Sequence, residues 1–371
     1  MNTGFGLEEA VREARERTGV PGVAAGLRRD GETTFAAEGV LALGDAEPVL
    51  DDTPFRIASI TKPFTATLAG ECLPLDEGLC RLLSHSAGLR CESRAPLPSA
   101  ADGLFSYSNA GYWAAGAACA EACGAPFEEA MQARVLDPLG LTATGFEEPL
   151  RPARGHVQEG ESGHRAVTED GYPVARRPSG GLWSTAGDLL RFATHHLAEP
   201  GPLHEPRVEA LGARYALGWW VRTLENGSTA LDHEGSIAGY QSLLLLVPEE
   251  ALALAVLTNS WRGSGLIRRI VESLELTPLA LAAAPLPDGV AGTYALDGVE
   301  AVVEVSGDGV IVSETERDPV TGISTATRFP AQPLGGGVFG FARGALMSHR
   351  LDFPRPGLAR IGWVALPRVE S

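Results

Sequence analysis

Two strand-forming regions that lie far apart in the sequence constrain the fold of this chain most. Residues 23–27 and 33–37 flank an Asp-Gly step, which favours a tight hairpin turn. Residues 241–247 and 252–258 are apolar runs joined by Pro-Glu-Glu, which predicts a buried antiparallel hairpin. Between the two hairpins, from residue 59 to about residue 145, the chain is rich in alanine and helical in period. We therefore expect one antiparallel sheet, completed by distant segments and flanked by helices.

Helical signals accompany both hairpins. Leu7, Ala10, Val11 and Ala14 recur at helical spacing, and residues 266–274 are expected to form a helix that packs on the second hairpin. Thr-Ala-Gly-Asp at residues 185–188 has the pattern of a capping box, so it predicts the start of a further helix.

The length of the chain favours two compact units. Its 371 residues exceed the roughly 250–300 residues at which a single core stops growing. Residues 279–288 are rich in proline and alanine, and short strands with glycine turns follow them. We expect a domain of residues 1–278 with a helical insert at about 59–180, a linker at 279–288, and a small all-β barrel at 289–371. The expected fold class is α+β: an antiparallel sheet flanked by helices with a helical insert, followed by a small C-terminal β-barrel domain.

Charge and hydropathy exclude several classes of function. A net charge of −17 at pH 7 would repel a nucleic-acid duplex or an anionic membrane surface. The longest apolar runs are far shorter than the roughly 18–20 residues of a membrane helix. Four glutamates fall within the first 17 residues, which a secretory signal would not tolerate. We expect no nucleic-acid partner, no membrane partner and a cytoplasmic location.

The cysteines and histidines do not have the spacing of a metal centre. The five cysteines are odd in number and confined to residues 72–123, unlike the framework of a disulfide-stapled secreted domain. Cys119 and Cys123 lie four apart on a predicted helix, but no histidine pair follows at zinc-finger spacing. We expect reduced thiols, no metal and no cofactor. The expected partner is a small-molecule or peptide substrate, and the sequence does not define an oligomeric state.

The chain contains one lysine, Lys62, among 30 lysines and arginines. Guanidinium does not lose its proton near neutral pH, whereas an amine can. Lys62 stands in Ser59-Ile-Thr-Lys62, and residues at i and i+3 of a helix share one face. A serine hydroxyl is a weak nucleophile unless a base within about 3 Å accepts its proton. This pair predicts a nucleophile with its own base; a capping serine with a surface lysine is the structural alternative.

Two further motifs add to this pair. Tyr107-Ser-Asn109 lies in an aromatic stretch, and His233-Glu-Gly235 immediately precedes the apolar strand at 241–247. Each residue also has a purely structural explanation: Tyr107 as a core aromatic, Asn109 as a turn residue and His233 as a polar group on an edge strand.

The order Ser-x-x-Lys, Tyr-x-Asn, His-x-Gly resembles the serine β-lactamase and penicillin-binding protein superfamily, in particular its class C β-lactamase, esterase and D-aminopeptidase branch. Residues 82–89 (Leu-Leu-Ser-His-Ser-Ala-Gly-Leu), 137–140, 180–185 and 257–259 also resemble motifs of that branch. The resemblance extends over about residues 20–259. The all-β C-terminal region resembles the lipocalin-like appendages of some D-aminopeptidases and of penicillin-binding-protein-type thioesterases that cyclise peptides.

The resemblance implies a role for each motif residue. Ser59 would attack a carbonyl, and Lys62 and Tyr107 would share the proton transfers. Asn109 would orient Lys62 and a substrate amide, while His233 and Gly235 would lie on a strand that borders the substrate. The backbone N–H groups of Ser59 and Ser236 would form the oxyanion hole. These roles involve no metal.

Two departures from the family pattern bear on the substrate. His233 replaces the usual lysine, and Glu234 stands where Ser, Thr or Gly is usual; both changes disfavour a substrate carboxylate at this strand. The segment between Lys62 and Tyr107 is also shorter than usual, which predicts a wider pocket.

We therefore expect a serine hydrolase that forms an acyl-enzyme on Ser59 and acts on a carboxylic ester or on an amide or peptide, as a β-lactamase-related esterase or D-aminopeptidase-like peptidase. One alternative is a biosynthetic acyltransferase or thioesterase that cyclises peptides. The other is a non-turnover acyl-sensor or pseudoenzyme.

Overall fold

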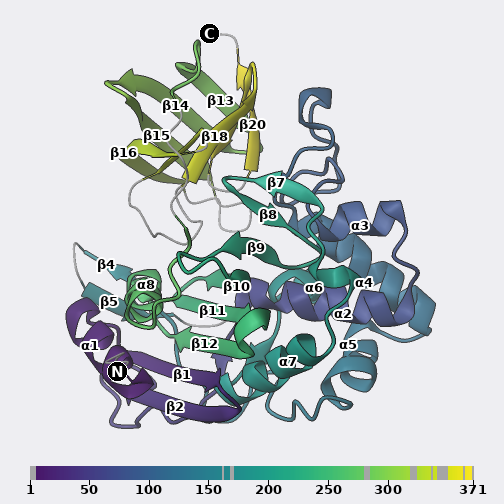
Figure 1. The fold of residues 1–371 in the computed structure, drawn as a ribbon, viewed down its shortest axis with the longest axis vertical. Helices are drawn as coiled ribbons and strands as arrows, with labels where there is room; N and C mark the ends of the chain where they lie inside the picture. Colours follow the sequence, from purple (N-terminus) through teal and green to yellow (C-terminus); the bar gives the residue numbers. More distant parts are fainter. Residues whose placement is uncertain are drawn as a thin grey trace.

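A computed structural model describes residues 6–160, 163–167, 171–279, 285–317, 324–335, 337–340, 350–361 and 364–369. An eight-stranded antiparallel sheet with helices on both faces forms the larger body, and a closed barrel of eight strands forms the smaller one (Figure 1). The predicted α+β fold class, with its C-terminal barrel, is confirmed. The predicted linker at 279–288 lies partly outside the described residues.

The central sheet joins strands from both ends of the larger body. In spatial order the strands are β2 (Glu32–Gly39), β1 (Gly22–Arg29), β12 (Leu252–Thr258), β11 (Tyr240–Val247), β10 (Thr229–Ile237), β9 (Trp220–Thr223), β8 (Ala213–Tyr215) and β7 (Val208–Ala210). Strand β1 pairs antiparallel with β12, with Val23 opposite Thr258. Both predicted hairpins are therefore present, and distant segments complete one sheet as expected.

Each face of the sheet has its own core. On one face, α1 (Leu7–Thr18) and α8 (Gly263–Ser273) pack on the apolar side of the strands and share one buried cluster with them. On the other face, α2 (Thr61–Cys72) and α7 (Ala186–Ala198) contribute to a larger cluster. Helix α2 is buried on all sides from residue 61 to residue 69, which is the behaviour of a central helix.

The region at 59–180 is more than a helical insert. Its helices are α2, α3 (Glu77–Leu83), α4 (Asn109–Cys123), α5 (Phe127–Met131) and α6 (Arg177–Gly180), with short helical turns η1 (Ala58–Ile60), η2 (Ser99–Ala101), η3 (Gln132–Leu136) and η4 (Val174–Arg176). It also holds the hairpin β4 (His156–Glu159) and β5 (Gly163–Ala166), and β3 (Phe55–Arg56) pairs with β6 (Trp183–Ser184) at its borders. Turns η5 (Pro202–His204) and η6 (Pro248–Glu250) lie in later connections.

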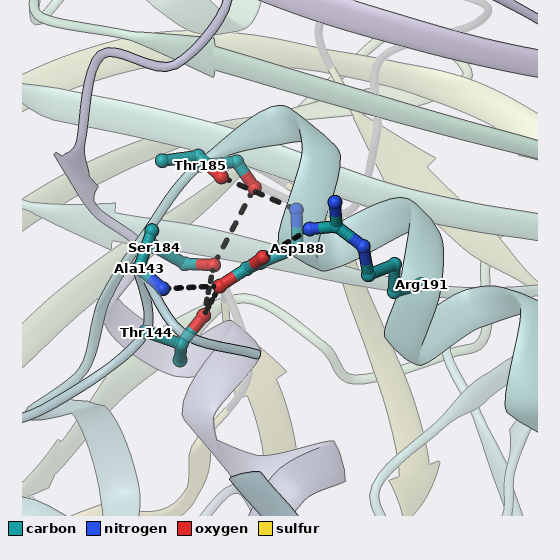
Figure 2. A network of polar contacts seen from close by, with 6 residues as sticks. All are labelled: Ala143, Thr144, Ser184, Thr185, Asp188 and Arg191. Atoms are coloured by element: carbon teal, nitrogen blue, oxygen red, sulfur yellow. Dashed lines mark hydrogen bonds and ion pairs between the residues drawn. The ribbon is translucent and has the colours of Figure 1, made fainter. Parts of the chain in front are cut away.

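Helix α7 begins at the predicted capping position, but the capping box is only half formed (Figure 2). The Thr185 hydroxyl accepts a hydrogen bond from the Asp188 N–H at 3.2 Å. The buried Asp188 carboxylate instead accepts from the Ala143 N–H at 2.8 Å, the Thr144 hydroxyl at 2.9 Å and Arg191 Nη1 at 2.6 Å. Asp188 thereby ties α7 to the loop after η3, which no local pattern predicts.

The barrel lies beyond β7 and β8 (Figure 1). Its strands are β13 (Gly292–Leu296), β14 (Val299–Ser306), β15 (Gly309–Arg317), β16 (Ser324–Gly335), β17 (Val338–Gly340), β18 (Arg350–Arg355), β19 (Leu358–Ile361) and β20 (Val364–Val369). It docks on the larger body through Arg360 Nη1, which donates to Glu209 O at 3.1 Å, and through Ala365 N, which donates to Ser106 Oγ at 3.1 Å. Within the described part of the chain, no helix has both the length and the apolar character needed to cross a bilayer.

Candidate active site

Ser59 lies in the turn η1 at the start of α2. The preceding residue, Ala58, has a positive φ of 45°, a conformation that costs a non-glycine residue free energy and occurs often at functional sites. Two neighbours hold this turn: Ile57 N donates to Leu182 O at 3.1 Å, and Ser242 Oγ donates to Ile57 O at 3.2 Å. The side chain of Ser59 is partly exposed, at the positive end of the α2 dipole.

Lys62 lies one helical turn from Ser59 and is completely buried. Its Nζ is 3.1 Å from Ser59 Oγ and donates to Ser179 O at 2.8 Å. Burial lowers the pKa of Lys62 from 10.5 to about 7, although the charge of nearby Glu92 opposes the shift. At neutral pH a large share of Lys62 is therefore an uncharged amine with a lone pair available for a proton.

The ring of Tyr107 lies next to the same amine, with its centroid 4.6 Å from Lys62 Nζ. The Tyr107 hydroxyl is hydrogen-bonded to Ser59, and burial raises the pKa of Tyr107 well above 10. Tyr107 is therefore a protonated phenol at neutral pH. Its position is fixed by Ser108, which caps α4 by accepting from Gly111 N at 3.0 Å, and by His85, whose ring centroid is 4.2 Å from that of Tyr107.

These contacts form one chain, which becomes directional when Lys62 is neutral. Lys62 Nζ donates to Ser59 Oγ and to Ser179 O, and the Tyr107 hydroxyl is hydrogen-bonded to Ser59. Once Lys62 is neutral, the lone pair of Nζ can accept the Ser59 proton across the same contact, and the Tyr107 phenol can donate to Ser59 Oγ. The geometry is that of a hydroxyl held between a base and a proton donor.

Asn109 is the first residue of α4, next to this group, but its amide has a different partner from the one expected. Asn109 Nδ2 donates to Glu92 Oε1 at 2.5 Å, and the other oxygen of Glu92 lies 3.5 Å from Arg176 Nη1. The amide that was expected to orient Lys62 and a substrate is thus engaged by a carboxylate of the same chain.

His233 lies in β10, with only 1% of its surface exposed. Its Nδ1 is 2.7 Å from Glu234 O, and its Nε2 is 3.1 Å from the Tyr215 hydroxyl. Burial, together with the charge of Lys62, lowers the pKa of His233 to about 3. His233 is therefore neutral, and it supplies no positive charge to a substrate.

Gly235 and Ser236 belong to the part of β10 that lies against η1. Strand β9 pairs with β10 from Thr229 to Asp232, so this pairing ends before His233. A Cβ on Gly235 would lie 2.1 Å from Ile57 O and 2.2 Å from Ser242 Oγ. Only glycine lets β10 approach the Ser59 turn this closely. The segment of β10 that contains Gly235 and Ser236 therefore lies against η1, the turn that holds Ser59.

Several residues at this site were not identified from the sequence. Ser179 contributes a backbone carbonyl, so its side chain gave no signal. His85 accepts from Ser108 N at 3.0 Å, and its segment at 82–89 was noted only as a resemblance. Glu92 lies in the loop between α3 and α4; nothing in its local sequence distinguishes it from the other acidic residues of the chain.

Comparisons with known proteins agree with this architecture. Penicillin-binding protein 4 of Amycolatopsis lactamdurans is 28% identical over 321 residues, covering 68% of this chain and 84% of that protein. Esterase EstB of Burkholderia gladioli is 26% identical over 286 residues, covering 55% of this chain and 71% of that protein. The relatives support a serine hydrolase in general.

Solved structures share the fold. SurE superposes with a TM-score of 0.75 at 24% identity, covering 98% of each chain, and has also been solved with D-Leu. The class C β-lactamase from Rhodobacter sphaeroides gives a TM-score of 0.64 at 22% identity, covering 72% of this chain and 97% of that one. The likeness to SurE thus includes the barrel, whereas the β-lactamase matches a smaller share of this chain.

The resemblance found in the sequence is confirmed by the β-lactamase family profile, which matches residues 7–74 and 79–274. Those residues contain Ser59, Lys62, Tyr107, Asn109 and the segment from His233 to Ser236. The chain belongs to the β-lactamase family.

Proposed function

We propose that the protein is a serine hydrolase that forms an acyl-enzyme on Ser59, with a carboxylic ester or an amide of a small or peptidic molecule as substrate. The observation that carries this proposal is the contact of 3.1 Å between Ser59 Oγ and the buried amine of Lys62. A lysine with a pKa of about 7 matches the pH at which a general base works best.

The chemistry follows from the directional chain. Neutral Lys62 takes the proton of Ser59 as Oγ attacks the substrate carbonyl. The N–H groups of Ser59 and Ser236 would stabilise the resulting oxyanion; loss of one such donor typically costs about 10²–10³ in rate. Protonated Lys62 then returns its proton through Tyr107 to the leaving group. Water, activated by the same amine, releases the acyl group and restores Ser59.

The charges around the site support esters and amides over β-lactams. β-Lactams and cell-wall peptides bring a carboxylate to the strand equivalent to β10. Here His233 is neutral, Glu234 is acidic, and Glu92 adds a second carboxylate beside Asn109. An uncharged or amine-bearing substrate meets no repulsion from these groups. This argument favours an esterase or a D-aminopeptidase-like peptidase.

A p-nitrophenyl acyl ester tests the proposal directly. We expect sustained release of p-nitrophenol, a transient increase in intact mass equal to the acyl group, and loss of both in Ser59→Ala. A stoichiometric burst with a stable adduct would instead identify a non-turnover acyl-sensor. Release that persists in Ser59→Ala would contradict the assignment of the nucleophile.

Acyl transfer is a second candidate, because the barrel docks beside the site. Ala365 N in β20 donates to Ser106 Oγ, directly next to Tyr107. Of the comparisons above, SurE is the one that shares this two-body arrangement and was solved with a D-amino acid. A barrel placed here can position an amine acceptor, including the amino end of the acyl chain itself. An added D-amino acid amide that becomes acylated faster than water reacts would favour a transferase that cyclises or extends peptides.

A further inference from the structure

Two cysteines meet at the ends of the helices that carry the candidate catalytic residues. Cys72 is the last residue of α2, and Cys123 is the last residue of α4. Helices α2 and α4 pack against each other. The Sγ atoms of Cys72 and Cys123 lie 2.7 Å apart and share a hydrogen bond, although the residues are 51 positions apart in the chain.

The surroundings leave both thiols of this pair partly accessible to a small-molecule oxidant. Both residues are partly exposed and both are free thiols, whereas Cys80 and Cys119 are buried. Burial and the contact with Cys123 raise the pKa of Cys72 to about 11. Arg134 acts in the opposite direction, because its positive charge favours the Cys72 thiolate.

We propose that Cys72 and Cys123 form a redox modification site, at which a small-molecule disulfide such as oxidised glutathione converts the two thiols into an intramolecular disulfide. The proposal is independent of the proposed catalytic function. It goes beyond the expectation of reduced thiols, because two of the five are in contact.

The reaction proceeds by thiol–disulfide exchange. The Cys123 thiolate attacks one sulfur of the oxidant, which forms a mixed disulfide and releases one small thiolate. Cys72 then loses its proton and attacks Cys123 Sγ, which releases the second small thiolate. The protein loses two protons and two electrons, which reduce the small disulfide to two thiols.

The disulfide would join the two helices at the ends opposite to the site. Lys62 lies about 15 Å from Cys72 along α2, since each helical residue rises 1.5 Å. A bond here constrains the unfolded chain and resists separation of α2 from α4. The oxidised protein should therefore unfold at a higher temperature, by roughly 3–5 °C.

Intact mass spectrometry of the folded full-length protein tests the proposal. After incubation with oxidised glutathione, acid quenching and labelling with N-ethylmaleimide in denaturant, we expect two fewer labels than on the reduced protein. The unlabelled protein should be lighter by about 2 Da. A peptide map should join Cys72 to Cys123, and dithiothreitol should reverse both the mass change and the shift in Tm.

Single substitutions separate this pair from its neighbours. Cys72→Ser and Cys123→Ser should abolish the intramolecular bond, whereas Cys119→Ala, which removes the buried thiol one turn before Cys123, should retain it. Cys80→Ser is a second control that should retain it. A full set of labels after oxidation, a mixed glutathione adduct as the sole product, or a bond that survives in Cys123→Ser but disappears in Cys119→Ala would each overturn the proposal.

Discussion

At the scale of single residues, burial gives Lys62 a chemistry that no arginine could supply. The amine is completely enclosed, yet it has a carbonyl acceptor in Ser179 and a hydroxyl partner in Ser59. Desolvation penalises the charged form of an amine, so its pKa falls to about 7. A guanidinium in the same place would remain charged. The single lysine of the chain therefore lies where loss of a proton is most useful.

Lys62→Arg tests this role while keeping the positive charge. We expect acylation by a p-nitrophenyl ester to fall by about 10²–10⁴, the usual contribution of a general base. In the parent protein the acylation rate should rise about tenfold per pH unit below pH 7, as Lys62 loses its proton, and level off above it. Stopped-flow release of p-nitrophenol across pH 5–9 measures both. Arg268→Lys, at a partly exposed position of α8, is the control; near-normal rates in Lys62→Arg would show that Lys62 is not the base.

Glu234 gives a prediction about the substrate. Its carboxylate is 14% exposed and lies 3.9 Å from Arg222 Nη2, on the strand segment that borders Ser59. Glu234→Thr should raise acylation by a penicillin relative to acylation by a neutral ester, by about tenfold, because a repulsive charge is removed. Competition between the two substrates, followed by intact mass, measures the ratio. Glu300→Thr, at an exposed position of β14, should leave the ratio unchanged. A ratio in Glu234→Thr equal to that of the parent protein would contradict the proposed repulsion.

At the scale of secondary structure elements, neighbouring elements hold α2 in position. A series of four hydrogen bonds ends on α2. Gly201 N donates to His204 Nδ1, and His204 Nε2 donates to His196 Nδ1. His196 Nε2 then donates to Thr67 Oγ1, and the Thr67 hydroxyl donates to Pro63 O. Because Thr67 has one proton and gives it to a carbonyl, both histidine tautomers are fixed. This series of hydrogen bonds ends at the carbonyl of Pro63, the residue after Lys62, so it holds the first turn of α2.

The contact between β10 and η1 gives a prediction at this scale. Gly235→Ala would place a methyl group 2.1 Å from Ile57 O, so β10 and η1 must separate. We expect a loss of at least about 10² in acylation rate, since displacements near 1 Å at a reacting centre cost this much. The folded state should remain, which circular dichroism would show.

Gly145→Ala is the matched control for Gly235→Ala, because a Cβ on Gly145 meets no atom within 4 Å. It should leave acylation unchanged. An active Gly235→Ala protein would mean that the spacing between β10 and η1 does not position Ser59.

At the scale of the whole molecule, the barrel docks on the larger body through an apolar cluster and through several polar contacts. Arg360 is central to them: Nε donates to Asp352 Oδ1 at 2.7 Å, Nη2 pairs with Asp352 Oδ2, and Nη1 reaches Glu209 O on the larger body. Arg360 and Asp352 are 5% and 9% exposed. Removal of one partner of a buried pair leaves an uncompensated charge.

Arg360→Met should therefore lower the free energy of unfolding of the barrel by about 3–5 kcal/mol. Urea unfolding followed by hydrogen exchange of the barrel strands measures this loss. Hydrolysis of a small p-nitrophenyl ester should stay within about threefold, because Arg360 is not part of the chain through Ser59. Arg328→Met removes an exposed pair with Glu304 and should cost under about 1 kcal/mol. Equal losses of unfolding free energy in the two variants would show that the buried pair stabilises the barrel no more than the exposed pair does.

The sequence by itself determined the features that depend on local spacing. The helix from Leu7 and both hairpins of the sheet follow from periodicity and turn residues, and the short strands with glycine turns after residue 288 indicate a small all-β domain. The approach of Lys62 to Ser59 follows from their separation of three positions at a helix start. Such features need only neighbouring residues, and their periods of 3.6 and 2 are written directly in the chain.

Only the tertiary structure decided what the motif residues contact. It pairs Asn109 with Glu92, makes His233 neutral, directs Asp188 to another loop and brings Cys72 against Cys123. Each outcome depends on the path of a loop or on the packing of two helices, and on the burial that results. Desolvation and long-range contacts arise from the whole fold, so no local pattern of residues encodes them.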